Sequence, residues 1–210
     1  MRPKISVVVT VYNEELNIKP LIERISTALE GYEYEIVYVD DGSSDNTLKE
    51  LYSNGHPRLK VVEFMKNYGQ SLALMAGIDQ ATGEFIATMD GDLQNDPSDI
   101  PAMLKLAEEG KWDMVAGERA NRQDGMILRK IPSLIANFII RNTTSVSLKD
   151  YGCALKVFRS ELAKDLGLYG ELHRFIPVLA HLEGARITQI PVKHHARQFG
   201  TSKYGLGRTF

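Results

Sequence analysis

Two aspartates separated by one glycine follow an apolar run near the middle of the chain. The run Phe85–Met89 ends at Asp90, Gly91 and Asp92, and Gln94 lies two residues further on. The glycine lets the backbone turn tightly between the acids, and oxygen-bearing side chains at alternating positions can converge on one hard cation. The spacing predicts a Mg²⁺ or Mn²⁺ site formed by Asp90, Asp92 and Gln94, although most aspartate pairs in surface turns are only solvated.

Acidic residues follow other apolar runs in the same way. The run Tyr34–Val39 is followed by Asp40 and Asp41, and Met114–Gly117 is followed by Glu118. Such runs are typical of buried strands, and ligands of parallel sheets bind at the carboxyl ends of the strands. We therefore expect these acids to border one site, with Asp40 placed to hydrogen-bond a base or a ribose.

The C-terminal part of the sequence supplies the opposite charge. Residues 184–210 contain five lysines and arginines and no acid. Glycine and small residues lie between Arg197 and Lys203, which predicts a mobile loop that could close over bound phosphates and exclude water. The alternative interpretation is a disordered basic tail.

Two common phosphate-binding motifs are absent from the sequence. No G-x-G-x-x-G follows the first predicted strand, and G-x-x-x-x-G-K-[ST] occurs nowhere. The first absence weighs against a nicotinamide or flavin oxidoreductase, and the second against a P-loop NTPase. Phosphates would then be held by a metal ion and by cationic side chains.

Strand and helix patterns alternate through the first 117 residues. The predicted strands are residues 5–11, 34–39, 59–64, 85–90, 114–117, 154–158 and 187–192. The predicted helices are residues 18–29, 46–54, 71–80, 98–109, 128–143, 160–165 and 171–181. This order is typical of an α/β fold whose mostly parallel sheet is flanked by helices on both faces. Pro191 predicts that the last strand lies at a sheet edge.

Length, charge and cysteine content exclude several other classes of protein. A chain of 210 residues is long enough for one domain with a substantial core. The net charge of −2 argues against a general nucleic-acid binder. Cys153 is the only cysteine, so no intramolecular disulfide can form. No apolar run reaches the roughly 18 residues needed to span a bilayer.

Six segments of the sequence carry recognisable motifs: Val9–Glu14, Val39–Asp45, Asn67–Gln70, Met89–Gln94, Asp150–Cys153 and Arg197–Tyr204. Taken together, they resemble the family-2 inverting glycosyltransferases with the GT-A fold. The Asp-Leu-Gln and Phe-Gly-x-Ser-Lys-Tyr sequences resemble the polyprenyl-phosphate branch, which includes dolichyl-phosphate mannose synthases, bactoprenol glucosyltransferases and undecaprenyl-phosphate formamido-arabinose transferases.

The resemblance implies a reaction and a cellular site. A UDP- or GDP-linked sugar would be transferred with inversion to a polyprenyl phosphate, with Mg²⁺ or Mn²⁺, for cell-envelope glycan synthesis at the cytoplasmic face of a membrane. Residues 1–117 would form the nucleotide-sugar-binding half of one catalytic domain, and residues 118–210 the acceptor-binding half and basic loop. Members continue into membrane-associated helices, so attachment would be peripheral or through a C-terminal segment outside this sequence. The sugar, the base and homo-oligomerisation stay open.

The resemblance also implies a role for each matched residue. Tyr12, Glu14 and Asp40 would contact the nucleoside. Asp90, Asp92 and Gln94 would hold the metal on the diphosphate, which Arg197 and Lys203 would grip. Arg119 would face the transferred sugar and the acceptor phosphate, and Arg129 and Ser133 would bind the lipid phosphate.

The acceptor determines whether a general base is needed. A sugar hydroxyl must lose a proton before it attacks, whereas a lipid phosphate, with a second pKa near about 6, is already ionised at neutral pH. Arginines that position the phosphate then matter more than a carboxylate base. The predicted catalytic set is Asp92, Arg119, Arg129 and Asp150. Asp124 and Asp150 are either orienting residues or loop residues, and His173 is structural or faces the acceptor.

Three other functions are compatible with parts of the sequence. A family-2 transferase that acts on a saccharide or protein hydroxyl would use a soluble acceptor and ignore lipid phosphate. A nucleotidyltransferase would release pyrophosphate from a nucleoside triphosphate, but no glycine-rich triphosphate loop lies near the N-terminus. A non-catalytic nucleotide-binding module would bind nucleoside diphosphate and turn over nothing.

Overall fold

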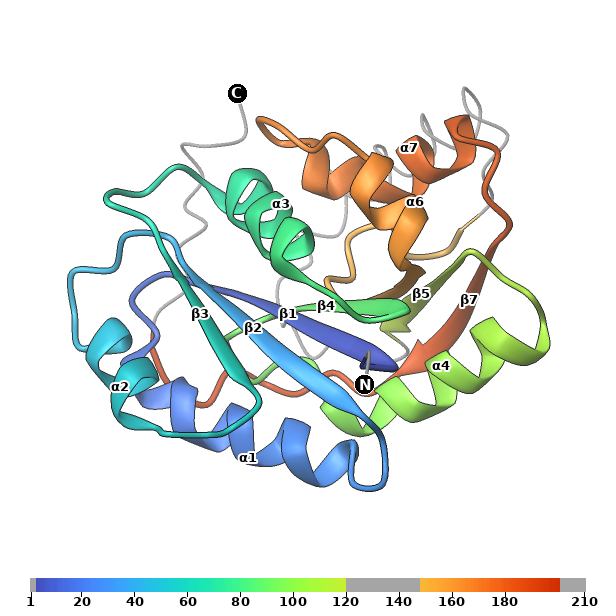
Figure 1. Cartoon of the computed structure of the whole chain (residues 1–210). Helices are drawn as coiled ribbons and strands as arrows, with labels where there is room; N and C mark the ends of the chain where they lie inside the picture. Colours follow the sequence, from blue (N-terminus) through green and yellow to red (C-terminus); the bar gives the residue numbers. More distant parts are fainter. Residues whose placement is uncertain (1–2, 120–147, 201–210) are drawn as a thin grey trace.

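A seven-stranded sheet forms the centre of the computed structural model, which describes residues 3–119 and 148–200. The strand order is β3-β2-β1-β4-β6-β5-β7 (Figure 1). In chain order the strands are β1 (Ile5–Val11), β2 (Tyr34–Asp40), β3 (Leu59–Glu63), β4 (Phe85–Asp90), β5 (Met114–Arg119), β6 (Lys156–Arg159) and β7 (Ile187–Val192). Among these strands only β6 is antiparallel to its neighbours, β4 and β5. The predicted α/β fold with a mostly parallel sheet is confirmed.

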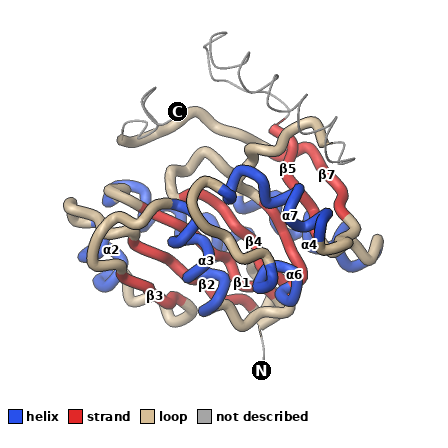
Figure 2. The backbone as a smooth tube through the Cα atoms, turned by 90° about the horizontal axis from the view of Figure 1, so that it is seen from above, coloured by secondary structure: helices blue, strands red, loops and turns tan. Residues whose placement is uncertain are grey.

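Helices cover both faces of the sheet (Figures 1 and 2). One face carries α1 (Ile18–Ala28), α2 (Thr47–Ser53) and α4 (Ile100–Glu109), and the other carries α3 (Gln70–Gln80), α6 (Ser160–Asp165) and α7 (Ile176–Leu182). Two hydrophobic cores result, because successive side chains of a strand point to opposite faces. In β1, Val7 and Val9 belong to the core with α1, whereas Val8 belongs to the core with α3.

The predicted elements agree with the structure apart from their ends. The helix predicted at residues 171–181 is divided into a 3-10 helix, Leu172–Phe175, and α7. The strand predicted from Ala154 begins at Lys156. The helix predicted at residues 128–143 lies outside the described residues. Strand β7, which contains Pro191, lies at the edge of the sheet, as predicted.

Strand β6 brings the segment that precedes it to the edge where the parallel strands end. Because β6 runs antiparallel to β4, its first residue, Lys156, pairs with Thr88 near the carboxyl end of β4. The preceding segment Asp150–Leu155 therefore lies at that same edge. This topology places Asp150 within reach of Arg119, the last residue of β5.

One further prediction concerns the single cysteine, and another concerns membrane-spanning segments. Cys153 is buried and free in the structure, as expected of a small apolar core residue. Over the described ranges, no helix combines the length and the apolar character needed to cross a membrane.

Candidate active site

An open cavity lies at the carboxyl edge of the sheet. Its walls come from the ends of β1 and β4, the loop after β2, the amino end of α3, the 3-10 helix before α7 and the segment after β7. The lining residues are Thr10, Val11, Tyr12, Glu14, Asp41, Asn67, Gly69, Gln70, Ala73, Asp90, Gly91, Asp92, Glu171, His173 and Arg197. Residues predicted from separate motifs are thus brought to one cavity.

Asp90 and Asp92 form the floor of this cavity beside the end of β1. Gly91 is required between them, because an added Cβ would collide with Val11 Cγ1. Asp90 Oδ1 accepts a hydrogen bond from Gln70 Nε2 at 2.6 Å, and Asp92 Oδ1 accepts one from the backbone N–H of Gln94 at 3.1 Å. These contacts hold both carboxylates at the strand end from which a ligand would approach.

Burial and mutual repulsion make the two carboxylates favour a cation. Burial, reinforced by the charge of Asp92, raises the pKa of Asp90 to about 7. Burial also raises the pKa of Asp92, while the Arg197 guanidinium opposes that increase. A divalent ion between the two carboxylates would relieve this repulsion, and their hard oxygens suit Mg²⁺ or Mn²⁺.

The donor set fits a metal that takes only part of its coordination from the protein. Within the described part of the chain, no group of three or more His, Cys, Asp or Glu side chains is placed to hold a metal. Mg²⁺ typically binds one or two carboxylates and completes its shell with water and substrate phosphates. Asp90 and Asp92 fit that pattern. Gln94 does not line the cavity, and its side-chain amide donates to the carbonyl of His195 at 3.3 Å.

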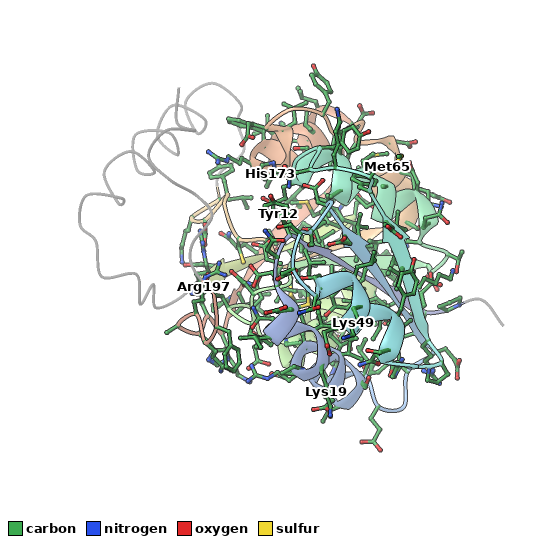
Figure 3. All side chains as sticks on the ribbon, turned by 90° about the vertical axis from the view of Figure 1, so that its left-hand side faces the viewer. Tyr12, Lys19, Lys49, Met65, His173 and Arg197 are labelled. Atoms are coloured by element: carbon green, nitrogen blue, oxygen red, sulfur yellow. The ribbon has the colours of Figure 1, made fainter. Side chains whose placement is uncertain are left out.

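Arg197 enters the cavity from the far end of the sequence (Figure 3). Its Nη2 lies 2.6 Å from Asp92 Oδ2, and its Nη1 lies 3.2 Å from Glu14 Oε1. The segment is held there by His195, whose backbone N–H donates to the Gln94 carbonyl at 2.8 Å and whose Nε2 lies 2.9 Å from Asp96 Oδ2. The predicted juxtaposition of a C-terminal cation with the aspartate pair is therefore present.

The nucleoside residues predicted from the sequence are only partly gathered in the cavity. Tyr12 and Glu14 line it, but Asp40 does not. Asp40 instead accepts hydrogen bonds from the backbone N–H and the hydroxyl of Ser43. The next residue, Asp41, lines the cavity and accepts from the backbone N–H groups of Tyr68 and Gly69 at 2.7 and 3.0 Å. The sequence pattern identified both acids at the end of β2, but it could not tell which of the two adjacent residues lines the cavity.

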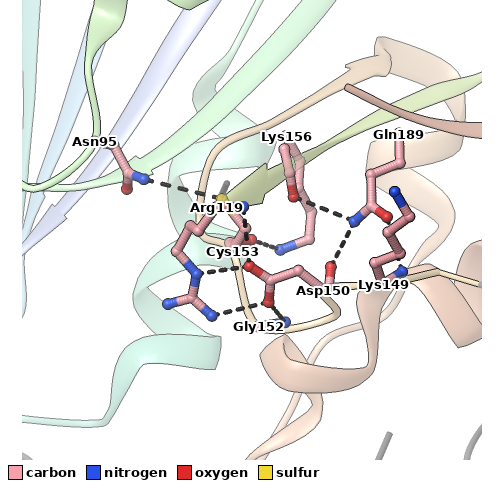
Figure 4. A network of polar contacts seen from close by, with 9 residues as sticks. Asn95, Arg119, Lys149, Asp150, Gly152, Cys153, Lys156 and Gln189 are labelled. Carbon is pink, nitrogen blue, oxygen red and sulfur yellow. Dashed lines mark hydrogen bonds and ion pairs between the residues drawn. The ribbon is translucent and has the colours of Figure 1, made fainter. Parts of the chain in front are cut away.

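Arg119 and Asp150 form a two-point ion pair beside the cavity (Figure 4). Arg119 Nε lies 2.6 Å from Asp150 Oδ2 and Nη2 lies 2.8 Å from Oδ1. Asp150 is buried and also accepts the backbone N–H of Gly152 at 3.1 Å. Asp150 is thus placed to orient the Arg119 guanidinium, which is one of the two roles predicted for it.

Lys156 is a buried cation that the sequence reasoning missed. It is 3% exposed, and its ammonium donates to the carbonyl of Cys153 (Figure 4). Burial lowers the pKa of Lys156, and its charge in turn opposes the increase in the pKa of Asp90. A lysine inside the apolar run Leu155–Phe158 was the available signal.

Several sequence-predicted residues cannot be placed. Arg129 and Ser133, assigned to the lipid phosphate, Lys203, assigned to the diphosphate, and Asp124 lie outside the described residues. Conversely, two residues line the cavity that were not predicted to bind the donor. These are Gln70 and His173.

Comparisons with known proteins agree on one family. Residues 6–167 match the model for "Glycosyl transferase family 2". The chain is 48% identical over 214 residues to a dodecaprenyl-phosphate galacturonate synthase from Rhizobium johnstonii, covering 99% of this chain and 63% of that protein. It is 42% identical over 210 residues to an undecaprenyl-phosphate 4-deoxy-4-formamido-L-arabinose transferase from Yersinia pestis, covering 98% of this chain and 64% of that protein. The chain thus spans slightly less than two thirds of these relatives.

Solved structures of low sequence identity share the fold. A mannosyltransferase from Pyrobaculum calidifontis in complex with GDP-Man and Mn²⁺ superposes with a TM-score of 0.67 at 23% identity, over 91% of this chain and 55% of that one. Glucosyl-3-phosphoglycerate synthase from Mycobacterium tuberculosis, in complex with Mn²⁺, UDP-glucose and phosphoglyceric acid, superposes with a TM-score of 0.69 at 20% identity, over 93% of this chain and 73% of that one.

Proposed function

The chain belongs to glycosyl transferase family 2 and has the GT-A fold, and we propose that it transfers a sugar from a nucleotide-sugar to a polyprenyl phosphate with inversion. In this reaction a phosphate oxygen of the acceptor attacks the anomeric carbon of the sugar. A new carbon–oxygen bond forms as the bond between that carbon and the nucleoside diphosphate breaks. The diphosphate leaves with the electron pair.

The observation that carries the proposal is the Asp90–Asp92 pair with Arg197 beside it. The pair lies at the carboxyl end of β4 and lines the open cavity. A bound Mg²⁺ or Mn²⁺ would neutralise charge that develops on the departing diphosphate. Asp90 and Asp92 would hold the metal, and Arg197 would exchange its contact with Asp92 for the diphosphate oxygens. Gln94 remains a proposed ligand on the strength of its spacing from the two aspartates and of the family resemblance.

The relatives' names support the acceptor and the donor class. Both are named for polyprenyl phosphates and for sugars. We propose that the donor is a UDP- or GDP-linked sugar and that the acceptor is a polyprenyl phosphate. Because that acceptor is a lipid, we propose a membrane-associated protein that acts in cell-envelope glycan synthesis. We place the reaction at the cytoplasmic face, with residues 1–117 binding the donor and residues 118–210 the acceptor.

The remaining residues receive roles that follow from their positions. Tyr12 and Glu14 line the cavity and would contact the nucleoside, and Asp41, which lines the same cavity, joins this proposed set. Asp40 does not line the cavity and keeps its role as a prediction. Arg119, oriented by Asp150, would meet the acceptor phosphate. Arg129 and Ser133 keep their proposed lipid-phosphate role and Lys203 its diphosphate role. Because the phosphate is already ionised, no carboxylate has to act as a base.

The test is turnover by the complete chain. UDP-galacturonic acid, UDP-glucose and GDP-mannose are each incubated with undecaprenyl phosphate in Mn²⁺ or Mg²⁺, and lipid-linked sugar is measured. Asp92→Asn should lower kcat at least 100-fold, because charge stabilisation of the leaving group is lost. Asp79→Asn, which changes an exposed aspartate of α3, is the matched control. Equal turnover by wild type and Asp92→Asn would exclude the metal role, and transfer only to a saccharide hydroxyl would exclude the lipid acceptor.

A further inference from the structure

His173 lines the cavity but takes no part in the roles assigned so far. It belongs to the 3-10 helix Leu172–Phe175, beside the amino end of α3, and it lines the same cavity as Tyr12 (Figure 3). Its Nδ1 is 2.8 Å from the hydroxyl oxygen of Ser71, and its backbone N–H donates to the same oxygen at 3.2 Å. Ser71 is 1% exposed. A buried residue of α3 therefore fixes both the backbone and the ring of His173.

These two contacts determine which ring nitrogen carries the hydrogen. A serine hydroxyl has a single hydrogen to donate. Its oxygen accepts the backbone N–H of His173, and its hydrogen is best satisfied by Nδ1, the polar group 2.8 Å away. Nδ1 is then the acceptor, so in the neutral ring the hydrogen is on Nε2. Burial lowers the pKa of His173 to about 4, so the ring is neutral at physiological pH.

In this tautomer the His173 ring carries an uncharged Nε2–H donor on a residue that lines the cavity. The diphosphate has better partners in a metal ion and Arg197, which carry positive charge. Glu171 lines the same wall, and its carboxylate would repel a phosphate. A sugar hydroxyl fits the combination, because its oxygen accepts from an N–H and its hydrogen can be donated to a carboxylate.

We propose that His173 is a specificity-determining residue that donates its Nε2–H to an oxygen of the donor sugar, with Ser71 as the positioning residue. The proposal rests on the proposed function, since it assumes a nucleotide-sugar in the cavity. It adds a contact to the sugar, as distinct from the nucleoside, the diphosphate and the acceptor. It also links sugar recognition to α3, whose amino end borders the aspartate pair through Gln70.

The experiment separates sugar binding from nucleotide binding. Kd values are measured by calorimetry in Mn²⁺ for UDP and GDP, and for UDP-galacturonic acid, UDP-glucose and GDP-mannose. The ratio of the nucleoside diphosphate Kd to the nucleotide-sugar Kd isolates the sugar's contribution. For the best-bound sugar, His173→Phe should reduce this ratio about five- to tenfold, the effect of one hydrogen bond. The Kd of the nucleoside diphosphate should stay within about twofold.

Three further variants make the result specific. His173→Gln places an amide N–H near the position of Nε2 and should recover part of the lost ratio. Ser71→Ala should reduce the ratio about two- to threefold, because the donor remains but its direction is no longer fixed. His181→Gln changes an exposed histidine at the end of α7 and should leave every Kd unchanged. Thermal unfolding of each variant shows whether it is folded.

Each outcome bears on a different claim. An unchanged ratio in both His173→Phe and Ser71→Ala would overturn the inference. Equal losses for nucleoside diphosphates and nucleotide-sugars would also overturn it, as would an effect confined to the KM for polyprenyl phosphate. A reduced ratio combined with no turnover of lipid phosphate by the wild type would instead exclude the proposed acceptor and leave the His173 assignment intact.

Discussion

Asp90 is held in a position that costs stability unless a cation is bound. Its carboxylate is partly buried beside Asp92, so ionisation is unfavourable, and its pKa is raised to about 7. Lys156 and Arg119 offset part of this cost. A site that holds an unfavourable charge in the absence of ligand is a common feature of functional centres. In this protein the cost comes first from desolvation of Asp90, and the charge of Asp92 adds to it.

The pH dependence of stability should reveal this cost. Because the pKa of Asp90 is higher in the folded state than in the unfolded chain, the favourable contribution of the protonated form is present below about pH 4 and is lost as the pH rises through about 7. Asp90→Asn, which stays neutral, should therefore gain stability relative to wild type between these values. We expect about 1–3 kcal/mol at pH 8.

The measurement is urea unfolding of both proteins at pH 5 and pH 8 without metal, with Asp79→Asn as the control. The advantage of Asp90→Asn should grow from pH 5 to pH 8 and shrink when Mn²⁺ is added, because Mn²⁺ stabilises only the wild-type site. A constant difference across this pH range would show that Asp90 has an ordinary pKa.

Helix α3 connects the hydrophobic core to two parts of the cavity. It packs on β1 and β2 through Gly77, where an added Cβ would collide with Val8 Cγ1 and lie 3.0 Å from Val39 Cγ2. Its first residue, Gln70, bonds Asp90, and Ser71 holds His173. Close packing at one end of this helix therefore sets the positions of ligand-binding groups at the other.

Replacing Gly77 by alanine tests this packing. Alanine has the higher helix propensity by about 1 kcal/mol, but overpacking a core typically costs about 1–3 kcal/mol. Because the collision is with side chains of a central strand, we expect the second effect to be larger and Gly77→Ala to be destabilised by about 1–2 kcal/mol. Affinity for nucleoside diphosphate should fall as well.

Urea unfolding and calorimetry measure both effects, and Asp79→Ala on the exposed side of α3 is the comparison. That variant should be as stable as wild type or slightly more stable. If Gly77→Ala were also more stable than wild type, α3 would not pack on the sheet as closely as described.

The cavity lies at the point in the sheet where the chain stops adding strands on one side of β1 and begins to add them on the other side. The chain passes from β1 outward through β2 to β3, then returns to β4 on the other side of β1. The crevice at the carboxyl ends of β1 and β4 is therefore left open by the connections, as in other sheets of this type. The segment after β7 then crosses to this crevice and brings Arg197 to it (Figure 1).

Arg197 should therefore be a main determinant of nucleotide affinity. Arg197→Gln removes the cation that would meet the diphosphate, and we expect Kd for UDP or GDP in Mn²⁺ to rise at least tenfold, the size of a charge-assisted hydrogen bond. Calorimetry at low and high salt measures this. Lys19→Gln makes the same charge change on the exposed side of α1, away from the cavity (Figure 3), and should have no effect. Equal affinities for Arg197→Gln and Lys19→Gln would contradict the diphosphate role.

Most of the fold could be predicted from local patterns. Apolar runs of five to seven residues identify strands, and helical spacing identifies helices, because burial selects residues according to the period of each element. The acids after β2 and β4 were visible for the same reason, since each interrupts an apolar run. The family resemblance added roles for residues such as Arg119 that no local pattern could supply.

The contacts that complete the site depended on tertiary structure. The antiparallel direction of β6 placed Asp150 against Arg119, and the turn after β2 directed Asp41, not Asp40, into the cavity. Ser71 and His173 lie 102 residues apart in the chain, and Asp92 and Arg197 lie 105 apart. Hydrophobic periodicity is a local property and determined the elements and the acids at their ends. The pairing of distant polar groups depends on how those elements pack, so only the folded chain decided it.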